Sequence, residues 1–315
     1  MELSGRWKTP EGRRVVDEVV SRLRRGRSLD KLGLGEVDGR VDLRGLPWPV
    51  PEIRSQRSGR KVFGIAQGSG FPEVRGAKLT GIDFGGAALP HLRLFDSTVA
   101  DCVFTGAAMK DFRAWGTSFE HCDLSRADLR EGLVGSWHEG KGNAWRQCRF
   151  DSARMDKAVM LGAVFEECRF HDVSLADAAV QFSGFRDVVF SGPLSEVAFY
   201  GFPFKSEHPP RPFFENVDFS AARLQNVMFV GFRLDGARFP EDADIAVLPD
   251  AQRRLERALA ALRGEQSDEA HYLTVVIEST VKMYGPDADL FVNYADLARD
   301  CGARGAELMR RLVNS

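Results

Sequence analysis

The chain has 315 residues, of which 43% are apolar and 28% are charged, and its formal net charge is −2. Its apolar runs are far shorter than the ~20 residues of a membrane-spanning helix, so we expect a soluble protein with no membrane contact. Five cysteines, with no apolar signal-like segment in residues 1–14, exclude a disulfide framework and favour the cytoplasm.

Residues 1–40 are predicted to form an N-terminal helical cap. Thr9 and Pro10 have the residue types that begin a helix, and the apolar spacing ends near Gly26. The charge of residues 1–76 is +6, which offers contact with nucleic acid as one interpretation. Arginine on the outer face of an amphipathic helix is ordinary solvation, so we expect no direct nucleic-acid binding. The apolar stripe consists of Val15, Val16, Val19, Val20 and Leu23.

Residues 41–76 show no clear period. Val41, Leu43 and Ile53 are candidate inward residues of an irregular first coil or linker. The proline-rich stretch at 47–51 does not suit a regular strand, because proline cannot donate a ladder hydrogen bond. The sequence predicts no further element in this part.

From residue 77 to 240 an apolar residue recurs at every fifth position, and a smaller residue lies two positions before it. Side chains two apart on an extended chain point the same way, so each unit places one large and one small side chain inward. The other three residues turn a corner. A helix cannot stay in phase with a period of five. The inward centres include Leu79, Phe84, Phe104, Phe119, Leu129, Phe150, Phe165, Phe170, Phe185, Phe190, Phe219, Phe229 and Phe239.

This pattern resembles the pentapeptide-repeat family, whose unit is Ala, Asp or Asn, Leu and two variable residues. The segments 122–124 (Cys-Asp-Leu) and 127–129 (Ala-Asp-Leu) match that unit most closely, and the resemblance covers about residues 77–239. It implies a mainly β fold, the right-handed quadrilateral β-helix, with four units in each coil. Residues twenty positions apart would then stack.

The cysteines support a coil of twenty residues independently. Cys102 and Cys122 are twenty apart, as are Cys148 and Cys168, and all four occupy the small inward position. We expect these thiols to pack in the core rather than to bind a metal, because they lack a CxxC spacing. At about 4.8 Å between strands, the repeat makes about eight coils and a rod of roughly 40 Å.

Two loops interrupt the predicted ladder, near 135–149 and 205–213. The first is rich in glycine and the second in proline. Both are interpreted as tolerated surface insertions or as recognition loops held by a rigid scaffold. Trp145 and Phe213 have the further alternative of packing on the coil. The candidate partner-binding residues are Trp137, His138, Lys141, Trp145, Lys205, His208, Arg211 and Phe213.

After Phe239 the spacing becomes helical, and residues 248–315 are predicted to form a C-terminal α-helical domain. We expect one helix from Pro249, a second capped by Ser267, a third from Leu290 to Gly302, and a fourth at the end of the chain. A domain of this size is near the lower limit for independent stability. It would therefore pack on the last coil or on a second copy, as a homodimer.

The sequence contains no constellation that predicts catalysis. Its six histidines are scattered, and it has no phosphate-binding loop, zinc-protease motif or serine-hydrolase motif. A solenoid filled by its own side chains also leaves little room for an active site. We therefore predict a protein that is not an enzyme and that uses no cofactor or metal.

The predicted function is binding of a protein partner. The resemblance implies a specific form of it, because some family members mimic duplex DNA, bind DNA gyrase or topoisomerase IV, and protect them from antibiotics. Mimicry of DNA requires a strongly negative face, whereas residues 77–240 contain 21 acidic and 18 basic residues. The alternative is a general structural or regulatory scaffold with another protein partner. A continuous acidic face would favour mimicry.

Overall fold

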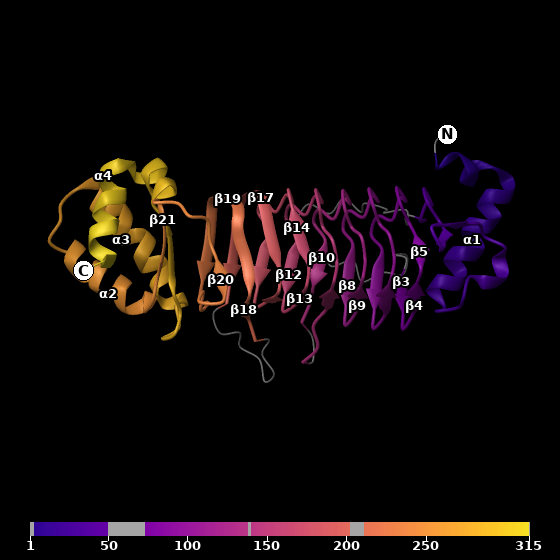
Figure 1. The fold of residues 1–315 in the computed structure, drawn as a ribbon, viewed down its shortest axis with the longest axis horizontal. Helices are drawn as coiled ribbons and strands as arrows, with labels where there is room; N and C mark the ends of the chain where they lie inside the picture. The colour runs from indigo at the N-terminus through magenta and orange to yellow at the C-terminus, as the bar shows by residue number, and fades with distance from the viewer. Residues whose placement is uncertain (1–2, 50–72, 138–139, 202–210, 315) are drawn as a thin grey trace, which may run out of the picture.

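The computed structural model describes residues 3–49, 73–137, 140–201 and 211–314. Stacked coils form a rod in the middle of the molecule, a helical cap lies at the N-terminal end, and a second helical unit lies at the C-terminal end (Figure 1). The protein is therefore mainly β with helical ends, as the repeat predicts.

Parallel strands from successive coils form two long sheets. Leu79 pairs with Val99, and Val99 pairs with Phe119, so positions twenty apart stack. This register confirms four units per coil. In spatial order the first sheet contains β20 (Ala237–Arg238), β19 (Val217–Val230), β17 (Val189–Tyr200), β15 (Ala179–Gln181), β12 (Val159–Leu161), β10 (Leu133–Gly135), β8 (Arg113–Trp115), β6 (Arg93–Phe95) and β3 (Glu73–Arg75), with β14 (Arg169–His171) also paired to β17. The second sheet contains β18 (Phe213–Glu215), β16 (Gly184–Arg186), β13 (Val164–Glu166), β11 (Ala144–Arg146), β9 (Ser118–Glu120), β7 (Thr98–Ala100) and β4 (Lys78–Thr80).

The other two sides of the coil are held by single bridges, such as Asp83 with Val103 and Ala88 with Ala108. At most corners one residue, two positions after the centre, adopts the left-handed conformation. Gly106 (φ 66°) and Asp101 (φ 53°) are examples. Glycine, aspartate and asparagine adopt this conformation more readily than other residues, and they occupy most of these corners.

The inward centres form stacked columns. The rings of Phe150 and Phe170 have centroids 4.6 Å apart, and Phe170 and Phe190 continue the stack at 4.7 Å. The centres predicted from the sequence lie buried, apart from Phe239, which is only partly buried against the core at the last coil. Stacked, fully buried aromatic rings are a large source of stabilisation in this narrow interior.

Trp145 packs on the coil, which is one of the two alternatives that the sequence left open, and does not lie in a partner-binding loop. Trp145 belongs to β11, pairs with Phe119 and Phe165, and is 0% exposed. Its ring stacks on Phe119 at 3.7 Å, and its indole nitrogen donates to the Val134 carbonyl at 3.1 Å. Trp145 lies five positions before Phe150, so it is an inward centre, and the first insertion ends before it.

Asn143 ties the base of this insertion to the core. Its side-chain amide donates to the carbonyls of Ala114 (3.0 Å) and Val134 (3.1 Å), and its side-chain oxygen accepts from the Thr117 amide (3.2 Å). Asn143 is 1% exposed. A buried side chain that satisfies backbone groups where the ladder is interrupted removes the penalty of leaving them unpaired.

The N-terminal helix α1 (Pro10–Arg24) covers the first coil. Thr9 caps it by accepting a hydrogen bond from the Gly12 amide, and its apolar stripe joins the core of the ladder. Asp42 accepts two hydrogen bonds from Arg6, at 2.7 and 2.8 Å, and these hold the pKa of Asp42 well below its usual range. The other elements near this end are η1 (Gly5–Lys8), η2 (Asp30–Leu32), β1 (Glu36–Val37), β2 (Arg40–Asp42) and β5 (Ile82–Asp83).

Part of an irregular first coil is present. Val41 pairs with Ile82, and Leu43 is 0% exposed. Trp48 is also buried in this core, which the sequence did not indicate. Ile53 lies outside the described residues.

The C-terminal unit differs from prediction in containing a pair of strands. Residues 290–293 form a strand, not the start of a helix, and it pairs antiparallel with residues 245–248. Leu290, Phe291 and Val292 are all buried, and three consecutive buried apolar residues suit a strand covered on both faces. The elements are β21 (Ile245–Leu248), α2 (Ala251–Leu262), α3 (Asp268–Thr280), η3 (Val281–Met283), β22 (Leu290–Asn293) and α4 (Tyr294–Asn314), which has non-helical residues at Cys301 and Gly302.

This unit packs on the last coil of its own chain. Phe291 packs edge-on against Phe229, with ring centroids 4.9 Å apart. The Asp289 carboxylate accepts from the Leu234 amide at 2.7 Å, and the Asp289 amide donates to the Phe232 carbonyl at 2.8 Å. These contacts cap the exposed strand edge of the solenoid. A homodimer through the same helices stays a prediction.

The corner conformation can be tested at Gly106, where an added side chain would meet no atom within 4 Å. Gly106→Val is expected to lower the free energy of unfolding by about 1–2 kcal/mol, because a β-branched residue resists positive φ. Gly106→Asn should lower it less. Urea unfolding measures both, and equal losses would contradict a conformational origin.

The position of Trp145 in the core can be tested against Trp137, a half-buried residue of the insertion. Trp145→Ala is expected to destabilise the protein by about 3–5 kcal/mol, because it removes a fully buried aromatic ring. Trp137→Ala should cost less than about 1 kcal/mol. Thermal or urea unfolding compares them, and a larger loss for Trp137→Ala would contradict this position.

Candidate interaction surface

The outward side of the first sheet carries an apolar row, which we call the apolar face. These residues lie immediately before or after the inward centres of successive coils, and each is half-buried by its neighbours. A contiguous apolar strip on the outside of a sheet is typical of an interaction site. The apolar face consists of Leu133, Val159, Leu161 and Ala179. Gln181 ends it after Leu161, while Ala198 lines a cavity and Tyr200 packs on the C-terminal unit.

Toward the N-terminus the same side becomes aromatic and basic. Phe95 and Trp115 stack at 4.5 Å, and the Arg75 guanidinium lies 3.8 Å from the Phe95 ring centroid. Arg113 forms an ion pair with Asp111 at 2.8 Å. This part of the surface is therefore amphipathic, and its carboxylate is already paired.

The adjacent side, formed by the second sheet, carries charges that neutralise one another. Arg146 pairs with Glu166 at 2.8 Å, and Arg186 pairs with both Glu166 and Glu215 at 2.6 Å. These side chains belong to successive coils and form one alternating row. Opposite charges stacked in this way stabilise neighbouring strands. They also leave little net electrostatic field on this side of the rod.

The described coils present no continuous acidic row. Along each row of stacked outward positions, carboxylates follow one another over at most two coils, as Asp111 with Glu131 or Glu167 with Asp187. Duplex DNA carries one negative charge per ~1.7 Å of its axis. The charges of the described ladder do not reproduce that pattern.

The two insertions leave the ladder at the same corner, between the first and the second sheet. One separates β10 from β11, and the other separates β17 from β18. Lys141 and Arg211 are exposed near these insertions, and Trp137 is half-buried. His138, Lys205 and His208 lie outside the described residues.

Phe213 lies within the ladder rather than in a loop. It is the first residue of β18, faces outward over Gly184, and has the Arg186 guanidinium 5.1 Å from its ring centroid. Its half-buried ring packs on the coil, which is the alternative that the sequence left open.

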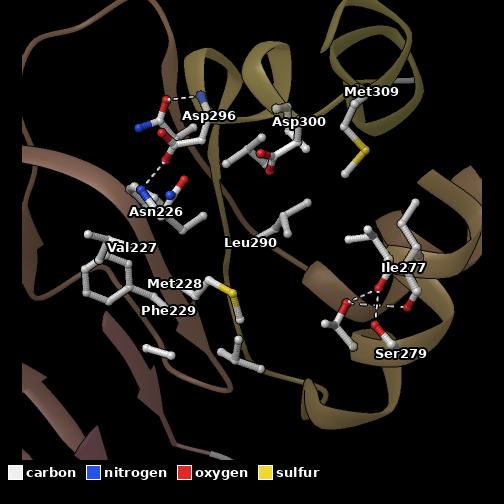
Figure 2. A pocket seen from close by; sticks show the side chains of 18 of the residues that line it. Asn226, Val227, Met228, Phe229, Ile277, Ser279, Leu290, Asp296, Asp300 and Met309 are labelled. Atoms are coloured by element: carbon white, nitrogen blue, oxygen red, sulfur yellow. Dashed lines mark hydrogen bonds between the residues drawn. The ribbon is translucent and has the colours of Figure 1, made fainter. Parts of the chain in front are cut away.

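A cavity of about 580 Å³ lies between the last coils and the C-terminal unit. Figure 2 shows Met228 on the ladder side and Asp296, Asp300 and Met309 on the side of the C-terminal helices. Asp296 accepts a hydrogen bond from the Asn226 amide at 2.9 Å. The sequence did not indicate this site, because it arises only where two distant segments meet.

The described residues offer little reactive chemistry. Burial raises the pKa of the Cys102 thiol to about 12, so the thiol stays protonated. The described part of the chain brings together no group of three or more His, Cys, Asp or Glu side chains that could hold a metal ion. None of its helices is long and apolar enough to cross a membrane.

No protein-family model and no curated protein matches the chain. Solved pentapeptide repeat proteins are similar at low identity. Rfr23 from the cyanobacterium Cyanothece is 12% identical, with 38% of this chain and 91% of that chain covered and a TM-score of 0.33. HetL from the cyanobacterium Nostoc, involved in regulating heterocyst differentiation, is 12% identical over 54% of this chain and 90% of that chain, with a TM-score of 0.32. QnrB1, a plasmid-mediated fluoroquinolone resistance protein, is 15% identical over 60% of this chain and 91% of that chain, with a TM-score of 0.31.

These similarities are too distant to assign a function. The fold follows from the chain's own register, in which five-residue units form four-sided coils and positions twenty apart pair in parallel. The protein therefore has the pentapeptide-repeat fold, a right-handed quadrilateral β-helix.

Proposed function

We propose that the protein is a non-enzymatic solenoid that binds a protein partner through its apolar face. The observation that supports this is the run of aliphatic side chains on the outside of β10, β12 and β15. Covering such a strip with a partner removes apolar surface from water, at about 25 cal/mol per Å².

The position of the two insertions also supports the apolar face as the partner-binding surface. Both leave the ladder at the corner that borders the apolar face. A partner seated on that face would therefore meet the exposed side chains of Lys141 and Arg211 at its edge. An apolar centre with a polar rim is the usual anatomy of a protein interface.

A matched pair of substitutions tests the proposal. Leu161 and Val164 are half-buried outward residues of one coil, on the first and second sheet respectively. Leu161→Glu is expected to abolish capture of the partner that the wild type retains from an extract of its source cells. Val164→Glu should leave capture intact. Circular dichroism confirms folding of both, and retained capture by Leu161→Glu would refute the proposal.

A more specific candidate function is the binding and protection of DNA gyrase or topoisomerase IV. The rod shape favours it, whereas the paired carboxylates of Asp111, Glu166 and Glu215 do not. The charge pattern therefore predicts no inhibition of gyrase supercoiling and no protection from a fluoroquinolone when the purified protein is titrated. Inhibition or protection at stoichiometric protein would establish this specific function instead.

A further inference from the structure

The cavity between the ladder and the C-terminal unit has the place and size of a ligand site. It opens where β17 and β19 face α3 and α4, and its volume of about 580 Å³ lies within the usual range for small-molecule pockets. Such pockets occur preferentially where two structural units meet.

Most of the cavity wall is apolar. Met228, 41% exposed, forms part of the ladder side, while Ile277 of α3 and Leu290 of β22 contribute from the C-terminal unit (Figure 2). Met309 of α4 also lines the cavity. An exposed methionine adapts its shape readily to a bound apolar group.

The charges of the cavity all have one sign. Glu196, Asp296 and Asp300 line it, and the lining includes no Lys, Arg or His. Asp296 is already engaged by Arg299 and by the Asn226 amide. Glu196 and Asp300 therefore supply the negative charge that a ligand would meet.

Glu196 and Asp300 have neutral partners. Glu196 accepts from the Asn226 side-chain amide at 2.6 Å, and Asp300 accepts from the Tyr272 hydroxyl at 3.4 Å. Within the described residues, neither forms an ion pair with a basic side chain. Both residues are exposed at the mouth of the cavity, where a cationic group can reach them without losing all of its hydration.

We propose that this cavity binds a small organic cation with an apolar body, such as an aliphatic or aromatic amine. Its apolar part would contact the exposed Met228 and the half-buried Val276 and Leu297, and its ammonium group would lie near Asp300 and Glu196. An anionic ligand of the same shape would be repelled. This ligand site goes beyond protein binding and does not rest on it.

Two probes of equal chain length test the sign of the charge. Octyltrimethylammonium and octyl sulfate are titrated separately into the full chain by isothermal titration calorimetry, below their micellar concentrations. We expect saturable binding of the cation at a single site and binding of the anion at least about tenfold weaker. Equal affinities, or no binding of the cation, would overturn the proposal.

Two matched pairs of variants locate the site. Asp300→Asn is expected to weaken cation binding roughly fivefold, whereas Glu278→Gln, which removes an exposed carboxylate of α3 outside the cavity lining, should leave it unchanged. Met228→Lys should abolish binding, and Met228→Leu should preserve it. Circular dichroism verifies folding. Equal effects within either pair would refute this location.

Discussion

The structure depends on backbone hydrogen bonds between each coil and the coils before and after it. The Phe84 amide donates to the Val103 carbonyl at 2.7 Å, and the Val103 amide donates back to the Ile82 carbonyl at 2.9 Å. Because this exchange is repeated on all four sides, every position stacks on its own equivalent. The same rules then apply to every coil of the ladder: centres are apolar, corners tolerate positive φ, and extra residues leave the ladder at a corner.

The same stacking organises the outside of the rod. Like charges in one row would lie about 4.8 Å apart and repel. The row on the second sheet avoids this by alternating Arg146, Glu166, Arg186 and Glu215. On the first sheet Arg93 stacks on Arg113, and Asp111 pairs with both, at 3.3 and 2.8 Å. Further along the same sheet the apolar face replaces charge. The two sides therefore differ in what they can bind, although their backbones are alike.

Much of this could be predicted from the sequence, because a period of five is a strong signal. The period placed the inward centres and both insertions, and the caps at Thr9 and Ser267 follow from local helix chemistry. For Trp145 the sequence leaves a loop position and packing on the coil as alternatives, because the residue follows a glycine-rich segment. Extending the count of five back from Phe150 favours the coil.

Other features depend on contacts between distant segments. Leu290–Asn293 has helical spacing in the sequence, but pairing with Ile245–Leu248 makes it a strand. The cavity forms only where Met228 meets the C-terminal helices. The apolar face can be recognised only when the outward residues of successive coils are aligned. That alignment requires the true length of the first insertion. The length follows from placing Trp145 in the ladder.

We propose that this solenoid binds through apolar surface rather than through mimicry of DNA. The most direct test is the salt dependence of its affinity for the partner that the wild type retains and Leu161→Glu does not. Between about 50 mM and 500 mM salt, we expect Kd to change by less than about threefold, because apolar contacts are not screened. A loss of affinity of more than roughly tenfold over that range would show that charge dominates and would contradict it.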